Sequence, residues 1–318
     1  MKTTKYTLIA ALAIFSAACQ NKITPDQTTN EVIFSASIDS PATKVVLGDA
    51  YVGSDNKNHY PMLWHGAEKI TIFDAEGKNR YFVGYAQERD EENNRVDVSI
   101  ASVNFKFEDR FEVDGTTFEL AEGTTYYAVE PYNSGHKLAD GKITQTIAHS
   151  QYPNPELGNL PCISRTVSSA GTISYGETAM AALAKTKDTY LSFKPVTALI
   201  KFTVGSENVT RVVFKGADPA PAVAGIDVVF DYTGDEPVLE SIGTTKTTIY
   251  LNNNNEPYTV GATYYIAVLP TTLTPKIGFN FNGSDQGTKY KTGSESITLK
   301  PGMILDLGLI EIAAPAAQ

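Results

Sequence analysis

The chain has 318 residues, with 26 basic and 36 acidic side chains and a formal net charge of −10 at neutral pH. No basic stripe appears along it, which argues against nucleic acid as a partner. Tyrosine (17) and phenylalanine (14) are plentiful, and glycine, proline and asparagine punctuate the chain, as is typical of proteins rich in β-strands.

The N-terminus has the layout of a secretory signal. Lys2 and Lys5 form a basic start, an apolar stretch covers 8–15, and small residues lead directly into Cys19. The apolar stretch is too short to span a bilayer as a helix. Cys19 resembles the cysteine of a bacterial lipobox, whose thiol accepts the lipid; the alternative is an ordinary signal peptide with an incidental cysteine. We expect a lipoprotein signal peptide over 1–18 and a lipid on Cys19 that tethers the protein to the outer membrane.

The segment after the signal carries no sign of regular structure. Residues 20–30 have no apolar periodicity and are predicted to form a flexible leader. If Cys19 carries the lipid, Cys162 is alone, so neither an intramolecular disulfide nor a cysteine metal cluster can form. We predict that Cys162 is a small buried side chain; the alternative is a reactive thiol.

Short alternating segments, separated by turn residues, recur along the chain. In the first, residues 31–38, the apolar residues are Val32, Phe34, Ala36 and Ile38. Strands of this length with such turns predict an all-β fold of antiparallel sandwiches. The later segments are 69–75, 80–86, 95–107, 124–132, 189–204, 209–216, 225–232, 246–251, 262–270, 276–283 and 296–312.

Two features divide the chain into domains. Residues 123–132 resemble residues 261–270: each has Gly, Thr, two Tyr, a strand and then Pro. The stretch 133–187 is irregular and separates two clusters of strands; its Ala-rich end, from 176, is the one place where a helix could form. We predict an N-terminal β-sandwich domain over 45–187 and a C-terminal one over 188–318.

Local motifs for catalysis or metal binding are not found in the sequence. There is no G-x-S-x-G, no Walker loop and no glycine-rich dinucleotide turn. The four histidines have no metal-ligand spacing, and the acidic segment 88–94 lacks the pattern of a calcium loop. We therefore expect no enzyme activity, no cofactor and no metal. A carboxylate pair for glycoside hydrolysis is defined by its separation in space, which a sequence does not give.

Five stretches in order resemble the fimbrillin family of Bacteroidetes lipoproteins, which are pilus subunits assembled from a lipoprotein precursor by proteolysis. The resemblance spans almost the whole chain. It implies two transthyretin-like antiparallel β-sandwiches in tandem, and a structural role in a cell-surface fimbria. The stretches are 32–44, 63–74, 125–132, 190–204 and 296–312.

The resemblance also implies assembly by strand exchange. A processing protease would remove the segment 19–44 with the first strand, and a strand from another fimbrial subunit would fill the groove left behind. Val32, Phe34, Ala36 and Ile38 would fill that groove in the precursor. Lys44 is the predicted cleavage position, although family processing often follows arginine. The alternative is that Lys44 is an ordinary loop lysine and the first strand stays, in an anchor or accessory subunit that keeps its lipid.

The closing strands, residues 296–312, are the candidate for the donated element; the alternative is a plain C-terminal strand pair. A competing hypothesis for the whole chain is a surface glycan-binding lipoprotein of a carbohydrate uptake system, which should carry exposed aromatics on one flat platform. A third is an extracellular hydrolase, which no local pattern supports. The apolar residues of the candidate donor strand are Ile304, Leu305, Leu307, Leu309, Ile310 and Ile312.

Overall fold

The structure is a computed structural model, and within its described residues the fold is all-β, as predicted. Apart from one 3-10 turn, η2 (Pro155–Leu157), the regular elements there are β-strands. Cys19, Lys44 and Ile312 lie outside the described residues. The described residues are 32–38, 46–47, 51–52, 58–59, 62–64, 68–85, 102–108, 118–215, 220–281, 288–292 and 295–311.

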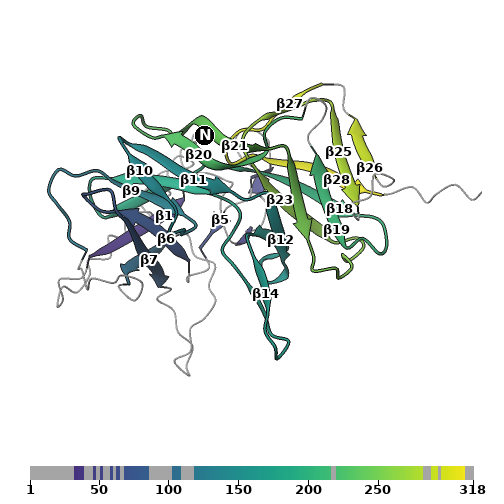
Figure 1. Ribbon diagram of the computed structural model, residues 1–318, viewed down its shortest axis with the longest axis horizontal. Helices are drawn as coiled ribbons and strands as arrows, with labels where there is room; N and C mark the ends of the chain where they lie inside the picture. Colours follow the sequence, from purple (N-terminus) through teal and green to yellow (C-terminus); the bar gives the residue numbers. More distant parts are fainter. Residues whose placement is uncertain are drawn as a thin grey trace, which may run out of the picture. The chain divides into compact units, whose positions relative to one another are not determined.

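The first sheet closes on itself as a barrel. Its strands follow an order in space that differs from their order in the chain, and β1 closes the ring between β8 and β17. The barrel strands β1, β6, β7 and β9 can be followed in Figure 1. In spatial order the strands are β1 (Ile33–Ile38), β17 (Tyr190–Pro195), β16 (Ala182–Thr186), β9 (Tyr126–Glu130), β6 (Lys69–Phe73), β7 (Asn79–Tyr85) and β8 (Ser102–Phe107).

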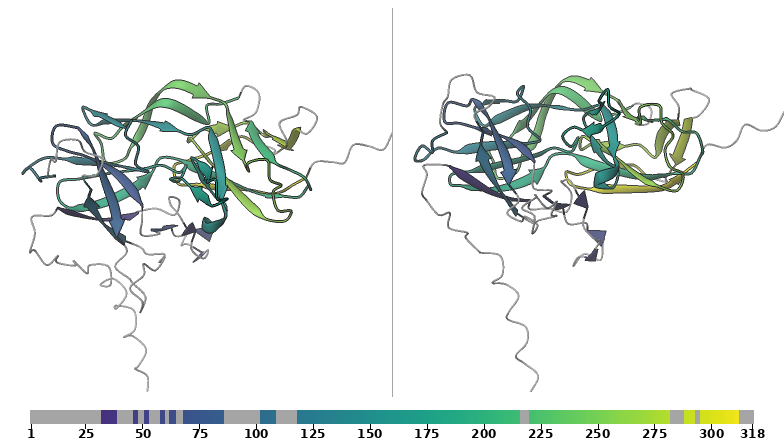
Figure 2. Two further views of the ribbon diagram at one scale, coloured as in Figure 1. Left: turned by 60° about the horizontal axis from the view of Figure 1, so that its bottom comes forward. Right: turned by 90° about the horizontal axis from the view of Figure 1, so that it is seen from below.

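Three open sheets follow the barrel. One has the order β10 (Lys137–Ala139), β11 (Lys142–Ile147), β20 (Ala224–Asp231), β21 (Val238–Lys246). A second has the order β13 (Leu160–Cys162), β12 (Ser150–Asn154), β22 (Thr248–Asn252), β19 (Arg211–Lys215), β25 (Lys276–Phe281), β26 (Thr288–Thr292). The third has the order β23 (Thr263–Val268), β18 (Ala198–Val204), β28 (Ile304–Ile310). The long β20–β21 hairpin is the green arch at the top of both views of Figure 2.

The remaining described strands form isolated pairs. These are β14 (Arg165–Val167) with β15 (Ile173–Tyr175), β24 (Thr272–Leu273) with β27 (Ile297–Thr298), β2 (Val46–Leu47) with β5 (Met62–Leu63), and β3 (Tyr51–Val52) with β4 (Asn58–His59).

The β6–β7 hairpin shows how the sequence sets the barrel strands. The Asp74 carboxylate accepts hydrogen bonds from the backbone N–H of Glu76 (3.0 Å) and Lys78 (2.8 Å). Gly77 has φ +76°, a conformation that glycine adopts without a steric penalty. Arg80 Nε lies 2.7 Å from Asp74 Oδ2, and both side chains are nearly buried. The turn therefore fixes the register of β6 against β7.

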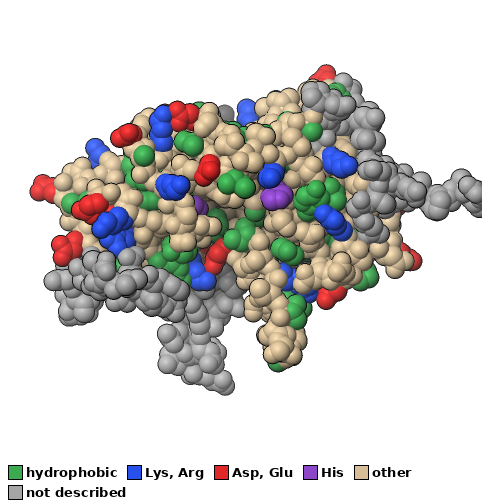
Figure 3. All heavy atoms as spheres, in the orientation of Figure 1, with side chains coloured by type: hydrophobic (Ala, Val, Ile, Leu, Met, Phe, Trp, Pro, Cys, Tyr) green, Lys and Arg blue, Asp and Glu red, His purple; other side chains and the backbone are tan. Residues whose placement is uncertain are grey.

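Buried apolar side chains form two large clusters. One fills the barrel and includes Phe34, Trp64, Phe82 and Phe193. The other is larger and lies among the open sheets, with Phe202, Phe214 and Phe279 among its aromatic residues. On the face drawn in Figure 3, basic and acidic side chains are interspersed and no patch of one sign is seen.

The helix allowed by the sequence near 176–187 does not form. Its Ala-rich part is strand β16, which pairs with β9 and β17. Ala182 and Ala184 are fully buried in the barrel core, where small side chains fit between larger neighbours. Tertiary pairing thus overrides the helix propensity of alanine, as it commonly does for short segments.

Strands from both sides of residue 187 share sheets. β11 pairs with β20, β12 pairs with β22, and β17 belongs to the barrel. The predicted boundary between 45–187 and 188–318 stays a prediction, as do the transthyretin-like topology and the pairing of two sandwiches in tandem.

Candidate functional site

β1 is bonded along both of its edges. It runs antiparallel to β8, where Ala36 lies opposite Val103, and parallel to β17, where Ala36 lies opposite Leu191. The Ser35 N–H also donates to the Thr189 carbonyl at 2.8 Å. Because β1 is the last piece needed to close the ring, taking it away would leave unpaired edges on β8 and β17.

Phe34 lies at the centre of the aromatic part of the barrel core. Its side chain is fully buried, with ring centroids 5.5 Å from Phe82, 5.8 Å from Phe118 and 6.1 Å from Tyr126. All three contacts are edge-to-face, a favourable geometry for aromatic pairs. Burial of a phenylalanine of this kind stabilises a fold by about 2–3 kcal/mol.

Ala36 belongs to the same cluster. It too is fully buried, and its cross-strand neighbours Val103 and Leu191 are buried apolar residues. Val32 and Ile38 are partly buried and pack on the same cluster. The four apolar residues of the first strand therefore face the barrel core, while their role as a removable plug stays a prediction.

On its outer face, β1 contributes to a cross-strand row of polar and aromatic side chains. The strand registers place Tyr85, Asn104, Ser35 and Tyr190 directly opposite one another across β7, β8, β1 and β17. Tyr85 is 37% exposed and Tyr190 is 51% exposed. Because the sheet closes as a ring of seven strands, the two tyrosines are three strands apart around it and their outward-facing rings point in different directions. No sequence pattern indicates this row, because it depends on the pairing of four strands.

Hydrogen bonds hold both tyrosines of this row. The Tyr190 hydroxyl lies 2.5 Å from Ser37 Oγ, on β1. The Tyr85 hydroxyl donates to Glu108 Oε1 at 2.8 Å, and Lys106 Nζ lies 5.5 Å from the Tyr85 ring centroid. Each ring therefore lies beside polar side chains, those of β1 for Tyr190 and those of β8 for Tyr85.

β28, the candidate donor strand, lies at the rim of a sheet. It runs parallel to β18 and has no neighbour on its other edge among the described strands. Ile310 is buried, Leu309 is 50% exposed, and the other apolar residues are partly buried. Gly308 has φ +64°, and its N–H donates to Asp306 Oδ1 at 2.8 Å, at the place where the register with β18 shifts. The partly buried residues are Ile304, Leu305 and Leu307.

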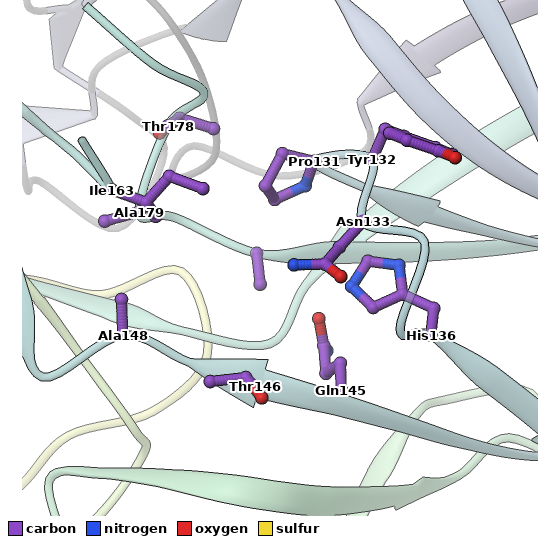
Figure 4. A pocket seen from close by; sticks show the side chains of 11 residues that line it. Pro131, Tyr132, Asn133, His136, Gln145, Thr146, Ala148, Ile163, Thr178 and Ala179 are labelled. Atoms are coloured by element: carbon purple, nitrogen blue, oxygen red, sulfur yellow. The ribbon is translucent and has the colours of Figure 1, made fainter. Parts of the chain in front are cut away.

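A small pocket lies where the loop after β9 meets β11. Figure 4 shows His136, Asn133 and Gln145 turned toward one another there. His136 Nδ1 lies 3.2 Å from the Thr71 hydroxyl, and burial lowers the pKa of His136 to about 4. The side-chain nitrogen of Gln145 is buried without a hydrogen-bond partner.

Cys162 is buried on β13, in agreement with the sequence prediction. Its Sγ lies 3.3 Å from the Tyr152 carbonyl and 3.2 Å from the Ser164 carbonyl. Burial raises the pKa of the thiol to about 11, so the side chain stays protonated and unreactive at neutral pH.

Among the described residues, no group of three or more His, Cys, Asp or Glu side chains could hold a metal ion. The same part of the chain contains no helix that is long and apolar enough to cross a membrane.

The chain matches no family model and no curated protein. Among solved structures, it is similar to proteins provisionally assigned to cell adhesion from Bacteroides ovatus (13% identity, TM-score 0.43, covering 87% of this chain and 91% of that chain) and Bacteroides uniformis (15%, 0.43, 88% and 93%). It is also similar to a fimbrial protein from Bacteroides ovatus (10%, 0.28, 89% and 50%). At these identities and TM-scores, the likenesses establish neither a shared family nor a shared function.

Proposed function

We propose that this protein is a structural subunit of a cell-surface fimbria that assembles by β-strand exchange. One observation carries the proposal: the first described strand, β1, completes a closed barrel with hydrogen bonds on both edges and four apolar residues facing the core. The tandem pair of transthyretin-like sandwiches, which the sequence resemblance implies, is part of this proposal.

The physics of the groove supports the exchange. Loss of β1 would expose backbone N–H and C=O groups on β8 and β17 and an apolar trench between them. A strand from another subunit would satisfy both, by adding to the sheet edge. Repeated head to tail, such a contact does not close, so it builds a filament. β28, bonded on one edge, is the candidate strand for donation to the next subunit.

Export and processing complete the proposal. A lipid on Cys19 tethers the precursor to the outer membrane, and a processing protease cleaves after Lys44 and releases the segment 19–44. If Lys44 is spared, the subunit keeps its lipid and its first strand and serves as an anchor or accessory subunit. Its partners are other fimbrial subunits. The role is structural rather than enzymatic.

The test is the intact mass and N-terminal sequence of the protein from the native cell surface, beside a gel of unboiled sample. A chain that starts at Val45 and runs as a ladder of multimers supports processing and polymerisation. A lipidated Cys19 start without a ladder contradicts a polymerising role. Lys44→Ala should abolish the ladder, whereas Lys22→Ala, in the leader, should leave it unchanged.

A second candidate is a surface glycan-binding lipoprotein, favoured by the row from Tyr85 to Tyr190. Tyr85 and Tyr190 are exposed, and each ring, with the polar side chains beside it, offers an apolar face and hydrogen bonds to a sugar chain. Because Ser35 lies within the row, this function needs β1 to stay. Calorimetry of the chain from Gln20 with surface oligosaccharides tests it: binding should be lost in Tyr190→Ala, and the absence of binding in the parent protein would dismiss it.

A further inference from the structure

We propose that the groove left by β1 takes a strand from a different kind of subunit and rejects this chain's own β28. The inference rests on the proposed strand exchange and adds to it the chemistry of the incoming strand. That strand carries a large aromatic residue at the place of Phe34, and alanine, glycine or serine two positions later, at the place of Ala36.

The place of Phe34 is a pocket made of aromatic rings. The three rings around Phe34 also contact one another: Phe82 and Phe118 are 5.0 Å apart, and Phe118 and Tyr126 are 5.7 Å apart. Phe82 belongs to β7 and Tyr126 to β9, so the pocket keeps its walls when β1 is absent. An aliphatic side chain in it would leave a void and lose the edge-to-face contacts.

The place of Ala36 excludes a large side chain. The residues opposite it on both neighbouring strands, Val103 and Leu191, are buried and apolar. Nearby in the same cluster, Trp64 packs against Phe105 (5.2 Å) and Phe193 (5.6 Å). A leucine in place of Ala36 would have to displace these packed neighbours, which protein cores resist.

β28 does not match these two places when it runs in the direction of β1. One face of β28 carries leucines, among them Leu305 and Leu307. If this face pointed into the groove, a leucine would lie at the place of Ala36. The opposite face of β28 carries Asp306 and Gly308. If Gly308 took the place of Ala36, Asp306 would enter the ring pocket. A carboxylate buried among aromatic rings without a partner is strongly unfavourable.

β28 fits the groove little better when it runs opposite to the direction of β1. Ile310 and Gly308 would then take the places of Phe34 and Ala36, so the ring pocket would be underfilled. Asp306 would fall at the place of Ile38, which packs on the barrel core. The residues 296–312 contain no aromatic side chain in any register. The chain therefore lies at a junction between unlike subunits, receiving one strand and donating another.

The experiment uses the chain from Gln20 with a specific protease site in place of residues 41–44, cleaved after folding so that β1 stays bound without a covalent link. Fluorescent peptides then compete for the groove. One has the sequence of residues 29–40, one that of 303–312, and a third carries both Phe34→Leu and Ala36→Leu. A fourth, with Ser35→Thr on the outer face, is the matched control.

The peptide of residues 29–40 and its control should exchange into the groove with equal affinity. The peptide of residues 303–312 and the double variant should bind about tenfold to a hundredfold more weakly, as the overpacking at Ala36 and the underfilled ring pocket require. Equal binding of the peptide 303–312 would overturn the inference and leave the proposed strand exchange standing. If no peptide exchanges, including that of residues 29–40, both the inference and the proposed function fail.

Discussion

The two strands proposed to take part in assembly, β1 and β28, differ in almost every physical respect. β1 is bonded on both edges, and two of its side chains are fully buried among aromatic rings. β28 has one neighbour among the described strands, and half of the Leu309 side chain is exposed. The comparison teaches that apolar alternation alone does not define a strand's role. A strand inside a closed ring loses hydrogen bonds on both edges when it is removed, whereas a strand at a rim loses those of one edge.

The largest effect is expected when a core side chain of β1 is shortened. Phe34→Ala removes a fully buried ring that contacts three others, and should lower the free energy of unfolding by about 3–5 kcal/mol. Urea unfolding of the chain from Gln20 measures it. Ser35→Ala, on the outer face of the same strand, is the control and should change stability by less than about 0.5 kcal/mol. Similar effects of the two substitutions would show that β1 does not fill the core.

The second prediction concerns a histidine bonded to barrel strand β6. His136 is neutral in the folded protein down to about pH 4, because burial lowers its pKa from the usual 6.5. Above pH 6.5 both states are neutral. As the pH falls from 6.5 to 4, the unfolded chain takes up a proton that the folded protein does not, so stability decreases. The loss attributable to this side chain reaches up to about 3 kcal/mol at pH 4.

Unfolding curves of the His136→Gln variant between pH 4 and 8 test this pH-dependent loss of stability. The variant should lose the part of the pH dependence that lies between 4 and 6.5, while His149→Gln should keep it. An unchanged pH profile in His136→Gln would show that the imidazole is not buried in its neutral form.

A third, smaller effect tests the link between the barrel and the β20–β21 hairpin. Lys185 Nζ, on β16, lies 3.2 Å from the carbonyl oxygens of Tyr232 and Thr233 and 4.9 Å from the Tyr232 ring centroid. Lys185→Met keeps the aliphatic stem and removes these contacts, which should cost about 1 kcal/mol because the site is partly exposed. Lys187→Met, on an exposed lysine nearby, should have no measurable effect in the same unfolding assay.

The smallest effect on stability is expected at β28. Leu309→Thr changes a half-exposed side chain on a strand with one neighbour, so the free energy of unfolding should change by less than about 0.5 kcal/mol. If β28 is the donated strand, the same substitution should weaken the ladder of multimers on an unboiled gel. A loss of stability comparable to that of Phe34→Ala would place β28 in the core of the subunit and remove the contrast with β1.

Several parts of the fold could be predicted because they depend on neighbours in the chain. The alternation of Val32, Phe34, Ala36 and Ile38 assigns one face of a strand to the core, since side chains alternate along any strand. The turn at Asp74 and Gly77 follows from local side-chain and backbone chemistry in the same way. The alanines near 182 show the limit, since their local preference for helix lost to pairing with β9 and β17.

The sequence by itself determined the all-β class, the inward face of the first strand and the buried character of Cys162. Tertiary structure alone decided that β1 lies between β8 and β17, that three rings surround Phe34, and that Tyr85 and Tyr190 share one cross-strand register. The physical reason is the separation along the chain of the residues that interact. Alternation and turns are set by residues a few positions apart, whereas ring closure and strand register arise from residues that are distant in the chain and meet only in the folded protein.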